Sequence, residues 1–199
     1  VALGKVMGSI GSDDQIAQAV RWAVDNGASV INMSLTRNTL DWPTSWDDAF
    51  QYAFQHDVVI VAAAGNRGSG TTEVGAPATI PGVLTVAGVD RQGQASFDAS
   101  SQGITIGVSA PSEQLVGANP GGGYVQWAGT SGAAPLVSGA VALVRAAHPE
   151  LKAADVIERI IKTARPVAGA VPSPIYGFGL LDAAAAVTAS VPHVTANPM

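Results

Sequence analysis

Apolar and polar positions follow two alternating patterns along the chain, one with the spacing of strands and one with the spacing of helices. Residues 58–64 (VVIVAAA) are apolar without interruption, which is typical of a strand buried on both faces of a parallel sheet. Residues 30–35 and 83–89 form similar β-rich runs, and we expect further strands at residues 1–8 and 104–108.

Helical spacing separates and follows these strands. Ser12 and Gln15 have the spacing of a capping box, apolar residues then recur at helical positions, and Asn26-Gly27 ends the pattern. Ser45 is expected to cap a second helix with Trp46 on its buried face. Three further helices are expected over residues 129–147, 153–163 and 182–189.

This alternation predicts an α/β fold with three layers, in which helices flank a mainly parallel sheet. The chain has 199 residues, which suits one domain with a sizeable core. We place this domain at residues 1–190. The glycine-rich residues 117–123 are expected to form a loop or hairpin. Residues 191–199 contain two prolines and no core pattern, so they are expected to form a tail or linker stub.

Composition narrows the classes of function. The net charge is −5 and no run of Lys or Arg occurs, so we expect no nucleic-acid partner. Cysteine is absent, which excludes disulfides, thiol catalysis and thiolate metal sites. No apolar stretch reaches the roughly 18 residues that span a bilayer, so a membrane anchor is expected only beyond residue 199. The sequence begins at Val1 rather than at methionine, so we expect a processed or excised piece.

Residues 129–135 (GTSGAAP) carry the sharpest candidate chemistry, because Ser131 stands at the start of the long apolar helix. A serine in this position is often a simple helix cap. The free N–H groups and positive dipole of a helix start also stabilise an oxyanion formed beside such a serine. Two other strand ends favour the second interpretation of Ser131, as a residue of a reactive site. Asn66 ends the segment 62–66 (AAAGN), and Ser34 lies within 32–36 (NMSLT). Sites in parallel sheets gather at such carboxyl ends.

Together the three segments resemble the subtilisin-like serine peptidases, or subtilases, in order and approximate spacing. That family has a G-T-S-x-A-x-P signature around its nucleophile, an A-A-G-N segment and an N-x-S-L-G strand. The resemblance covers residues 1–189, and the Ala/Val-rich, cysteine-free composition is similar to secreted actinobacterial members such as the mycosins. It implies a subtilisin-like fold without its N-terminal part, in a protein secreted from, or held at the surface of, a bacterium.

The resemblance also implies roles for individual residues. Ser131 is the expected nucleophile, and its own N–H and the Asn66 side chain are the expected oxyanion hole. A polypeptide substrate is expected to pair with one strand edge and to have residues 10–12 on its other side. The expected walls of the substrate site are Ser34, Leu35 and Thr36 on one side, Ala63, Ala64 and Gly65 on the other, with Gly129 and Thr130 beside the nucleophile. Thr36 replaces the usual glycine and is expected to narrow the pocket entrance.

A serine nucleophile needs a base and an orienting carboxylate. In subtilases the aspartate and histidine precede the helix that begins here near Asp13, so we expect them on a segment upstream of Val1, continuous with this chain or separate from it. His56, His148 and His193 are not expected to reach Ser131, and this chain alone is expected to be inactive. No metal or cofactor is expected, although the resemblance leaves calcium open at main-chain oxygens of residues 78–83. Ala76-Pro77 stands where the family often has a cis peptide.

Two other functions remain open at this point. The first is a non-catalytic subtilase-like module that binds peptides along residues 34–36; the retained Ser131 and Asn66 argue against it. The second is a nucleotide-binding α/β domain, prompted by the glycines of residues 65–70. Their spacing is not G-x-G-x-x-G, and residues 71–73 do not resemble a helix start.

Overall fold

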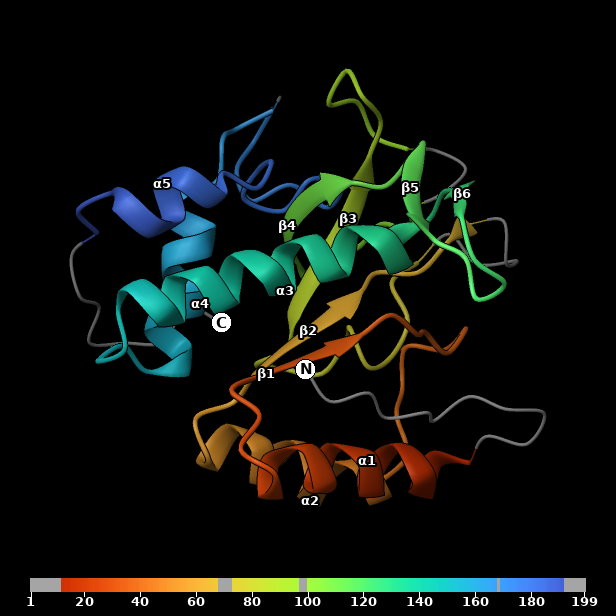
Figure 1. Ribbon diagram of the computed structural model, residues 1–199, viewed down its shortest axis with the longest axis vertical. Coiled ribbons are helices and arrows are strands. Elements are labelled where there is room, and N and C mark those ends of the chain that lie inside the picture. The colour runs from red at the N-terminus through yellow and green to blue at the C-terminus, as the bar shows by residue number, and fades with distance from the viewer. Residues whose placement is uncertain (1–11, 68–72, 97–99, 168, 192–199) are drawn as a thin grey trace.

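The computed structural model describes residues 12–67, 73–96, 100–167 and 169–191. A parallel sheet with strand order β1-β2-β3-β4 forms the middle of three layers, which confirms the predicted α/β architecture (Figure 1). The strands of this sheet are β1 (Val30–Met33), β2 (Val59–Ala63), β3 (Leu84–Val89) and β4 (Ile106–Pro111). The predicted strand at residues 1–8 lies outside the described residues.

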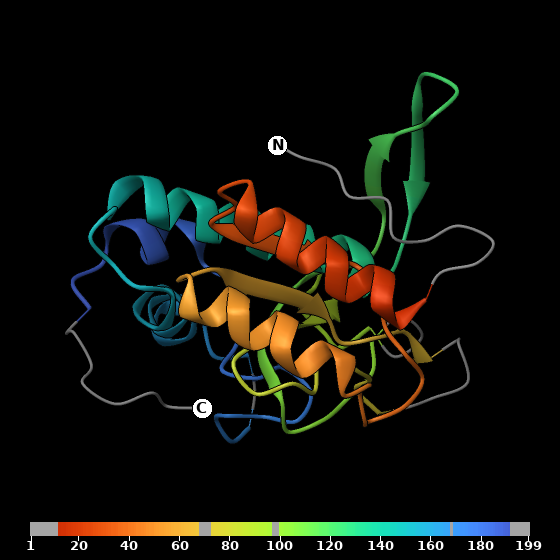
Figure 2. The same ribbon diagram turned by 90° about the horizontal axis from the view of Figure 1, so that it is seen from below.

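Helices cover both faces of the sheet. One pair packs on one face and the other three helices lie on the opposite face (Figures 1 and 2). The first pair is α1 (Asp13–Asp25) and α2 (Ser45–Gln55), and the other three are α3 (Thr130–Ala147), α4 (Ala153–Thr163) and α5 (Ala183–Thr188). All five positions of β2 are buried, because alternate side chains enter the two cores that these helix layers form.

The open edge of β1 is the boundary of the sheet. Within the part of the chain that the structure describes, β1 pairs only with β2, in parallel register from Val30 opposite Val59. Asn32 is exposed on this strand. An edge strand presents unpaired N–H and C=O groups, so this edge is suited to receive a further strand.

The capping residue predicted from the sequence is confirmed for α1 and wrong for α2. Ser12 caps α1 in a capping box, with Gln15 N donating to Ser12 Oγ over 3.3 Å and Ser12 N donating to Gln15 Oε1 over 3.2 Å. The prediction that Ser45 caps α2 is wrong. Thr44 is the N-cap residue, in a helical conformation and without a side-chain bond. Trp46 N instead donates to Pro43 O over 2.9 Å, because the chain turns into the helix one residue earlier than expected.

Helix α3 lies against all four strands, with its apolar residues in the core. It is 18 residues long and apolar enough to cross a bilayer by length and composition, although no segment was expected to be. A core helix meets the same criteria, and the packing of α3 on the sheet accounts for its apolar character. Pro135 is the sixth residue of α3 and has no N–H to donate to Ser131 O; that carbonyl accepts from Ser34 Oγ over 2.7 Å instead.

Two loop regions were predicted with different success. Residues 117–123 belong to an antiparallel hairpin of β5 (Leu115–Ala118) and β6 (Tyr124–Trp127), which projects from the body of the molecule (Figure 2). The hairpin prediction is therefore confirmed. The strand expected at 104–108 starts later, at Ile106, because a turn that pairs Ile106 N with Gly103 O leaves Ile104 94% exposed.

Candidate active site

Three chain segments meet at the carboxyl edge of the sheet. Ser34 follows β1, Gly65 and Asn66 follow β2, and Ser131 is the second residue of α3. Helix α3 runs opposite to the strands, so its amino end lies at the edge where β1 and β2 end (Figure 1). The fold thus gathers the residues that sequence motifs singled out separately.

Ser131 and Ser34 are joined by two reciprocal hydrogen bonds. Ser34 Oγ donates to Ser131 O over 2.7 Å, and Ser131 Oγ donates to Ser34 O over 3.3 Å. Ser131 is half-buried, and its hydroxyl donates to a main-chain carbonyl, which cannot act as a base. This pair fixes the start of α3 against the segment that follows β1.

The Asn66 amide is oriented by Thr130. Thr130 N and Thr130 Oγ1 both donate to Asn66 Oδ1, each over 2.9 Å. A backbone N–H can only donate, so the side-chain atom that it meets must be the amide oxygen. Thr130 is fully buried, and its hydroxyl also accepts from Gly65 N over 3.2 Å. The Nδ2 group of Asn66 is consequently left free of these bonds.

Gly129 leaves room beside that amide. It adopts φ +137°, a conformation that favours glycine, and its N–H donates to Ser112 O over 2.8 Å. A Cβ atom at this position would lie 3.3 Å from Asn66 Nδ2. A side chain at residue 129 would therefore press on the amide that the start of α3 holds in place.

The expected walls of the substrate site are mostly main chain. Leu35 packs against the core under α1 and α2, Ala64 belongs to the same core, and Ala63 points into the core under α3. These three residues thus present backbone at the site and not side chains. Of residues 10–12, only Ser12 is described, and Ile10 and Gly11 lie outside the described residues.

Sequence reasoning missed two residues of a polar chain beside Ser34. Asn32 Nδ2 donates to Ser34 Oγ over 2.9 Å, and Ser138 Oγ, on α3, lies 3.0 Å from Asn32 Oδ1. Asn32 was part of the strand motif, but only its place on the outer edge of β1 reveals the link to α3. These hydrogen bonds tie the edge strand β1 to α3, the helix that carries Ser131.

Gly132 is explained by the β5–β6 hairpin. A Cβ atom on Gly132 would lie 2.2 Å from Leu115 Cδ1 and 2.9 Å from the Trp127 ring. Both side chains come from the hairpin, and they take the room beside α3 that a larger residue after the serine would need. Glycine at this position therefore allows the hairpin to rest on the first turn of the helix.

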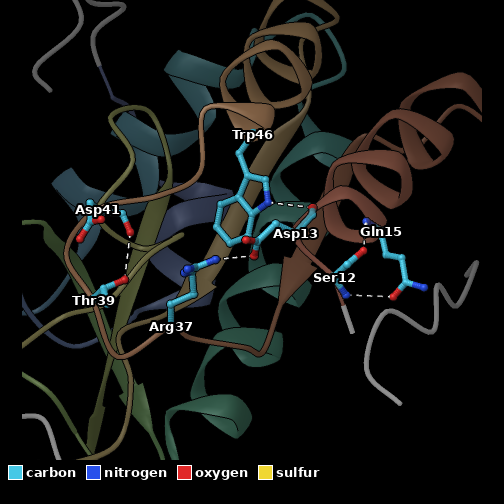
Figure 3. A network of polar contacts seen from close by, with 7 residues as sticks. All are labelled: Ser12, Asp13, Gln15, Arg37, Thr39, Asp41 and Trp46. Carbon is cyan, nitrogen blue, oxygen red and sulfur yellow. Dashed lines mark hydrogen bonds and ion pairs between the residues drawn. The ribbon is translucent and has the colours of Figure 1, made fainter. Parts of the chain in front are cut away.

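A second polar cluster follows the segment 34–36 (Figure 3). Arg37 forms an ion pair with Asp13, and its guanidinium lies 5.8 Å from the centre of the Trp46 ring. Trp46 Nε1 donates to Asp13 O over 2.9 Å. The cluster connects the start of α1, the segment after β1 and the start of α2, and so holds the chain immediately after Thr36.

The described histidines lie away from Ser131. His56 ends α2, before the amino end of β2, and its ring packs on Tyr52 with 4.1 Å between ring centres. His148 ends α3, at the opposite end from Ser131; a helix of 18 residues separates its ends by about 25 Å. His193 lies outside the described residues. Neither described histidine is placed to act as base for Ser131.

Metal ligands are not gathered in the described ranges. No group of three or more His, Asp or Glu side chains is arranged to hold a metal ion there. In the loop proposed for calcium, Ala78 O accepts from Thr85 Oγ1 over 2.5 Å and Ile80 O accepts from Val83 N over 3.1 Å. Each of these oxygens accepts a hydrogen bond within the chain, and calcium at this loop stays an expectation. The Ala76-Pro77 peptide is cis, as the resemblance implied.

The profile of the subtilase family (peptidase S8) matches residues 4–179. The chain belongs to the subtilase family. Subtilisin E of Bacillus subtilis is 38% identical over 187 residues, which cover 92% of this chain and 47% of subtilisin E. Mycosin-5 of Mycobacterium tuberculosis is 34% identical, with coverage of 93% of this chain and 38% of mycosin-5. The chain thus spans about half or less of these subtilase relatives.

Solved subtilase structures share this fold. MycP1 with its N-terminal propeptide removed superposes with a TM-score of 0.80 at 33% identity, covering 96% of this chain and 71% of MycP1. The patellamide maturation protease PatA has a TM-score of 0.79 at 30% identity, covering 88% of this chain and 68% of PatA. This agreement confirms the predicted subtilisin-like fold and the resemblance to mycosins.

Proposed function

We propose that this chain is the C-terminal part of the catalytic domain of a serine endopeptidase whose nucleophile is Ser131. The observation that carries the proposal is the position of Ser131 on the first turn of α3, beside the Asn66 amide that Thr130 orients. A helix start and a side-chain amide both favour negative charge at this point. Family membership supports the reaction class.

Groups of this chain and of an upstream segment that carries the aspartate and histidine carry out the steps of the proposed mechanism. Ser131 Oγ attacks the carbonyl carbon of a peptide bond, and the developing oxyanion binds Asn66 Nδ2 and Ser131 N–H. The hydroxyl proton passes to a histidine, which later gives it to the leaving amine. An aspartate orients that histidine. For this transfer Ser131 Oγ must turn from Ser34 O, which accepts its proton in the chain as described.

We infer that the aspartate and histidine come from a segment upstream of this chain that packs beside β1. The outer edge of β1 has no strand partner within the described residues. The bond from Ser138 to Asn32 marks the flank of α3 that faces β1, and Pro135 and Ala142 are exposed on that same flank. Small side chains there allow another element to approach both the edge strand and the nucleophile.

We also place the complete protein outside the bacterial cell or at its surface. The support is the similarity to subtilisin E and to MycP1, one structure of which is described as an essential component of a type VII secretion system. The substrate would be an extended polypeptide that pairs with residues 34–36.

The test is covalent labelling of the complete protein with a serine-reactive phosphonate, followed by peptide mapping. We expect label on Ser131, none on the Ser131→Ala variant, and unchanged labelling of Ser45→Ala, a surface serine at the start of α2. This chain alone should label at background rate, and adding the upstream segment should restore labelling and peptide hydrolysis.

A non-catalytic peptide-binding module is the second candidate, favoured by the bond from Ser131 Oγ to a main-chain carbonyl. Peptide affinity in the complete protein, without labelling of Ser131 and without hydrolysis, would replace the peptidase proposal with this one.

A further inference from the structure

Thr36 belongs to one of the two segments that enclose the reacting carbonyl in the proposed mechanism, and its hydroxyl reaches the other segment. Ser131 Oγ contacts the segment after β1, and the oxyanion position faces Asn66, on the segment after β2. The subtilase resemblance implies that the residue whose carbonyl is attacked directs its side chain into the space between residues 34–36 and residues 63–65. We call this space the specificity pocket.

The methyl group of Thr36 packs against two glycines beside this space. A Cβ atom on Gly65 would lie 3.1 Å from Thr36 Cγ2. A Cβ atom on Gly75 would lie 1.8 Å from Arg37 O and 2.7 Å from Thr36 Cγ2, so this glycine also packs directly on the Arg37 carbonyl. Thr36 Cγ2 is thus among the nearest side-chain atoms at both glycines, and it takes up space that a glycine at residue 36 would leave open.

The hydroxyl group of Thr36 holds the side chain across the pocket. Thr36 Oγ1 donates to Ala63 O over 3.2 Å, which joins one wall to the other. Threonine is branched at Cβ and turns about χ1 only between a few rotamers, and another rotamer would give up this bond. The backbone beside it is held as well, because Arg37 N donates to Ala76 O over 2.7 Å.

The far side of the pocket is small and polar. Ser101 is 0% exposed, and its Oγ lies 3.1 Å from the position of a Cβ on Gly65. This hydroxyl has no hydrogen-bond partner among the described residues, while Ser101 N donates to Gly65 O over 2.8 Å. This side of the pocket thus provides no apolar lining for a long or aromatic side chain.

We propose that Thr36 closes the specificity pocket, so that the peptidase cleaves after residues with small side chains: glycine, alanine or serine. This inference rests on the proposed function and names its substrate class. A larger side chain would have to displace Cγ2 and break the bond between Thr36 Oγ1 and Ala63 O. Pockets that lack room for one methylene group already discriminate by about 10- to 200-fold.

The test is the hydrolysis of peptides that differ only in the residue before the scissile bond: glycine, alanine, serine, leucine or phenylalanine. The complete wild-type protein should show a higher kcat/KM for alanine than for phenylalanine. Thr36→Gly should raise the phenylalanine-to-alanine ratio by at least about tenfold. Thr36→Val, which keeps the bulk and removes the hydroxyl, should remain selective for small residues. Thr36→Ser, which removes only the methyl group, should open the pocket in part and is the variant to use if Thr36→Gly does not fold.

Two outcomes separate the inference from the function on which it rests. A wild-type preference for leucine or phenylalanine, or an unchanged ratio in Thr36→Gly and Thr36→Ser, would overturn the closed pocket and leave the peptidase in place. Absence of hydrolysis across the whole peptide series, together with absence of label on Ser131, would remove the proposed function and the inference with it.

Discussion

Asn66 and Thr130 share one oxygen: the N–H and the hydroxyl of Thr130 both donate to Asn66 Oδ1 over 2.9 Å. Thr130→Val keeps the shape of the side chain and removes both hydrogen bonds of its hydroxyl, the one to Asn66 Oδ1 and the one from Gly65 N. In the complete protein, the loss of the bond to Asn66 should lower kcat by roughly 3- to 10-fold with little change in KM, and the loss of the bond from Gly65 N should lower stability. Thr130→Ser should restore kcat. Equal kcat for wild type and Thr130→Val would show that Thr130 does not position the amide.

Asn66→Ala removes the proposed oxyanion donor itself. The expected loss in kcat is about 10² to 10³, a size taken from the equivalent asparagine of subtilisin. The comparison with Thr130→Val is informative because that variant retains the amide. If Asn66→Ala lowered KM and kcat together or left both unchanged, the oxyanion assignment would be wrong.

Gly132 and Gly139 lie on the same helix and differ in what surrounds them. Gly132 faces Leu115 and Trp127, whereas a Cβ on Gly139 would meet nothing within 4 Å. Gly132→Ala should destabilise the protein by about 1–3 kcal/mol through overpacking. Gly139→Ala should stabilise it by up to about 1 kcal/mol, because alanine favours helices. Denaturant unfolding of both variants measures the difference.

Relief of the clash provides the control for this pair. Leu115→Ala combined with Gly132→Ala should recover part of the lost stability, since Leu115 Cδ1 is the nearest atom to the added methyl group. Equal effects of alanine at residues 132 and 139 would show that the hairpin does not rest on the first turn of α3.

Asp13 and Arg37 form an ion pair whose side chains are 42% and 38% exposed. Water and salt screen a pair of this exposure, so a double-mutant cycle with Asp13→Asn and Arg37→Gln should give a coupling of roughly 0.2–1 kcal/mol. The coupling should shrink when the salt concentration is raised to about 1 M. A coupling that does not depend on salt would indicate that Arg37 acts through its packing on Trp46 rather than through its charge.

Local patterns in the sequence predicted much of this molecule. The buried strand β2, the capping box of α1 and the extent of α4 follow from residue spacing over a few positions, and the structure has them as expected. The serine at the start of α3 and the asparagine after β2 were recognised by motifs of the same short range. Caps and periodicity act between near neighbours, so the sequence by itself was sufficient for them.

The tertiary structure decided how these pieces face one another. Thr130 orients Asn66 across 64 residues, Thr36 reaches Ala63 across 27 residues, and Leu115 covers Gly132 from a hairpin. Even the start of α2 departed from its local signal, since Pro43 O took the N–H of Trp46. Such contacts depend on how layers pack and on which rotamers the packing leaves open. The sequence therefore predicted the candidate nucleophile and the fold, whereas only the folded chain showed that the Thr36 hydroxyl reaches Ala63 O.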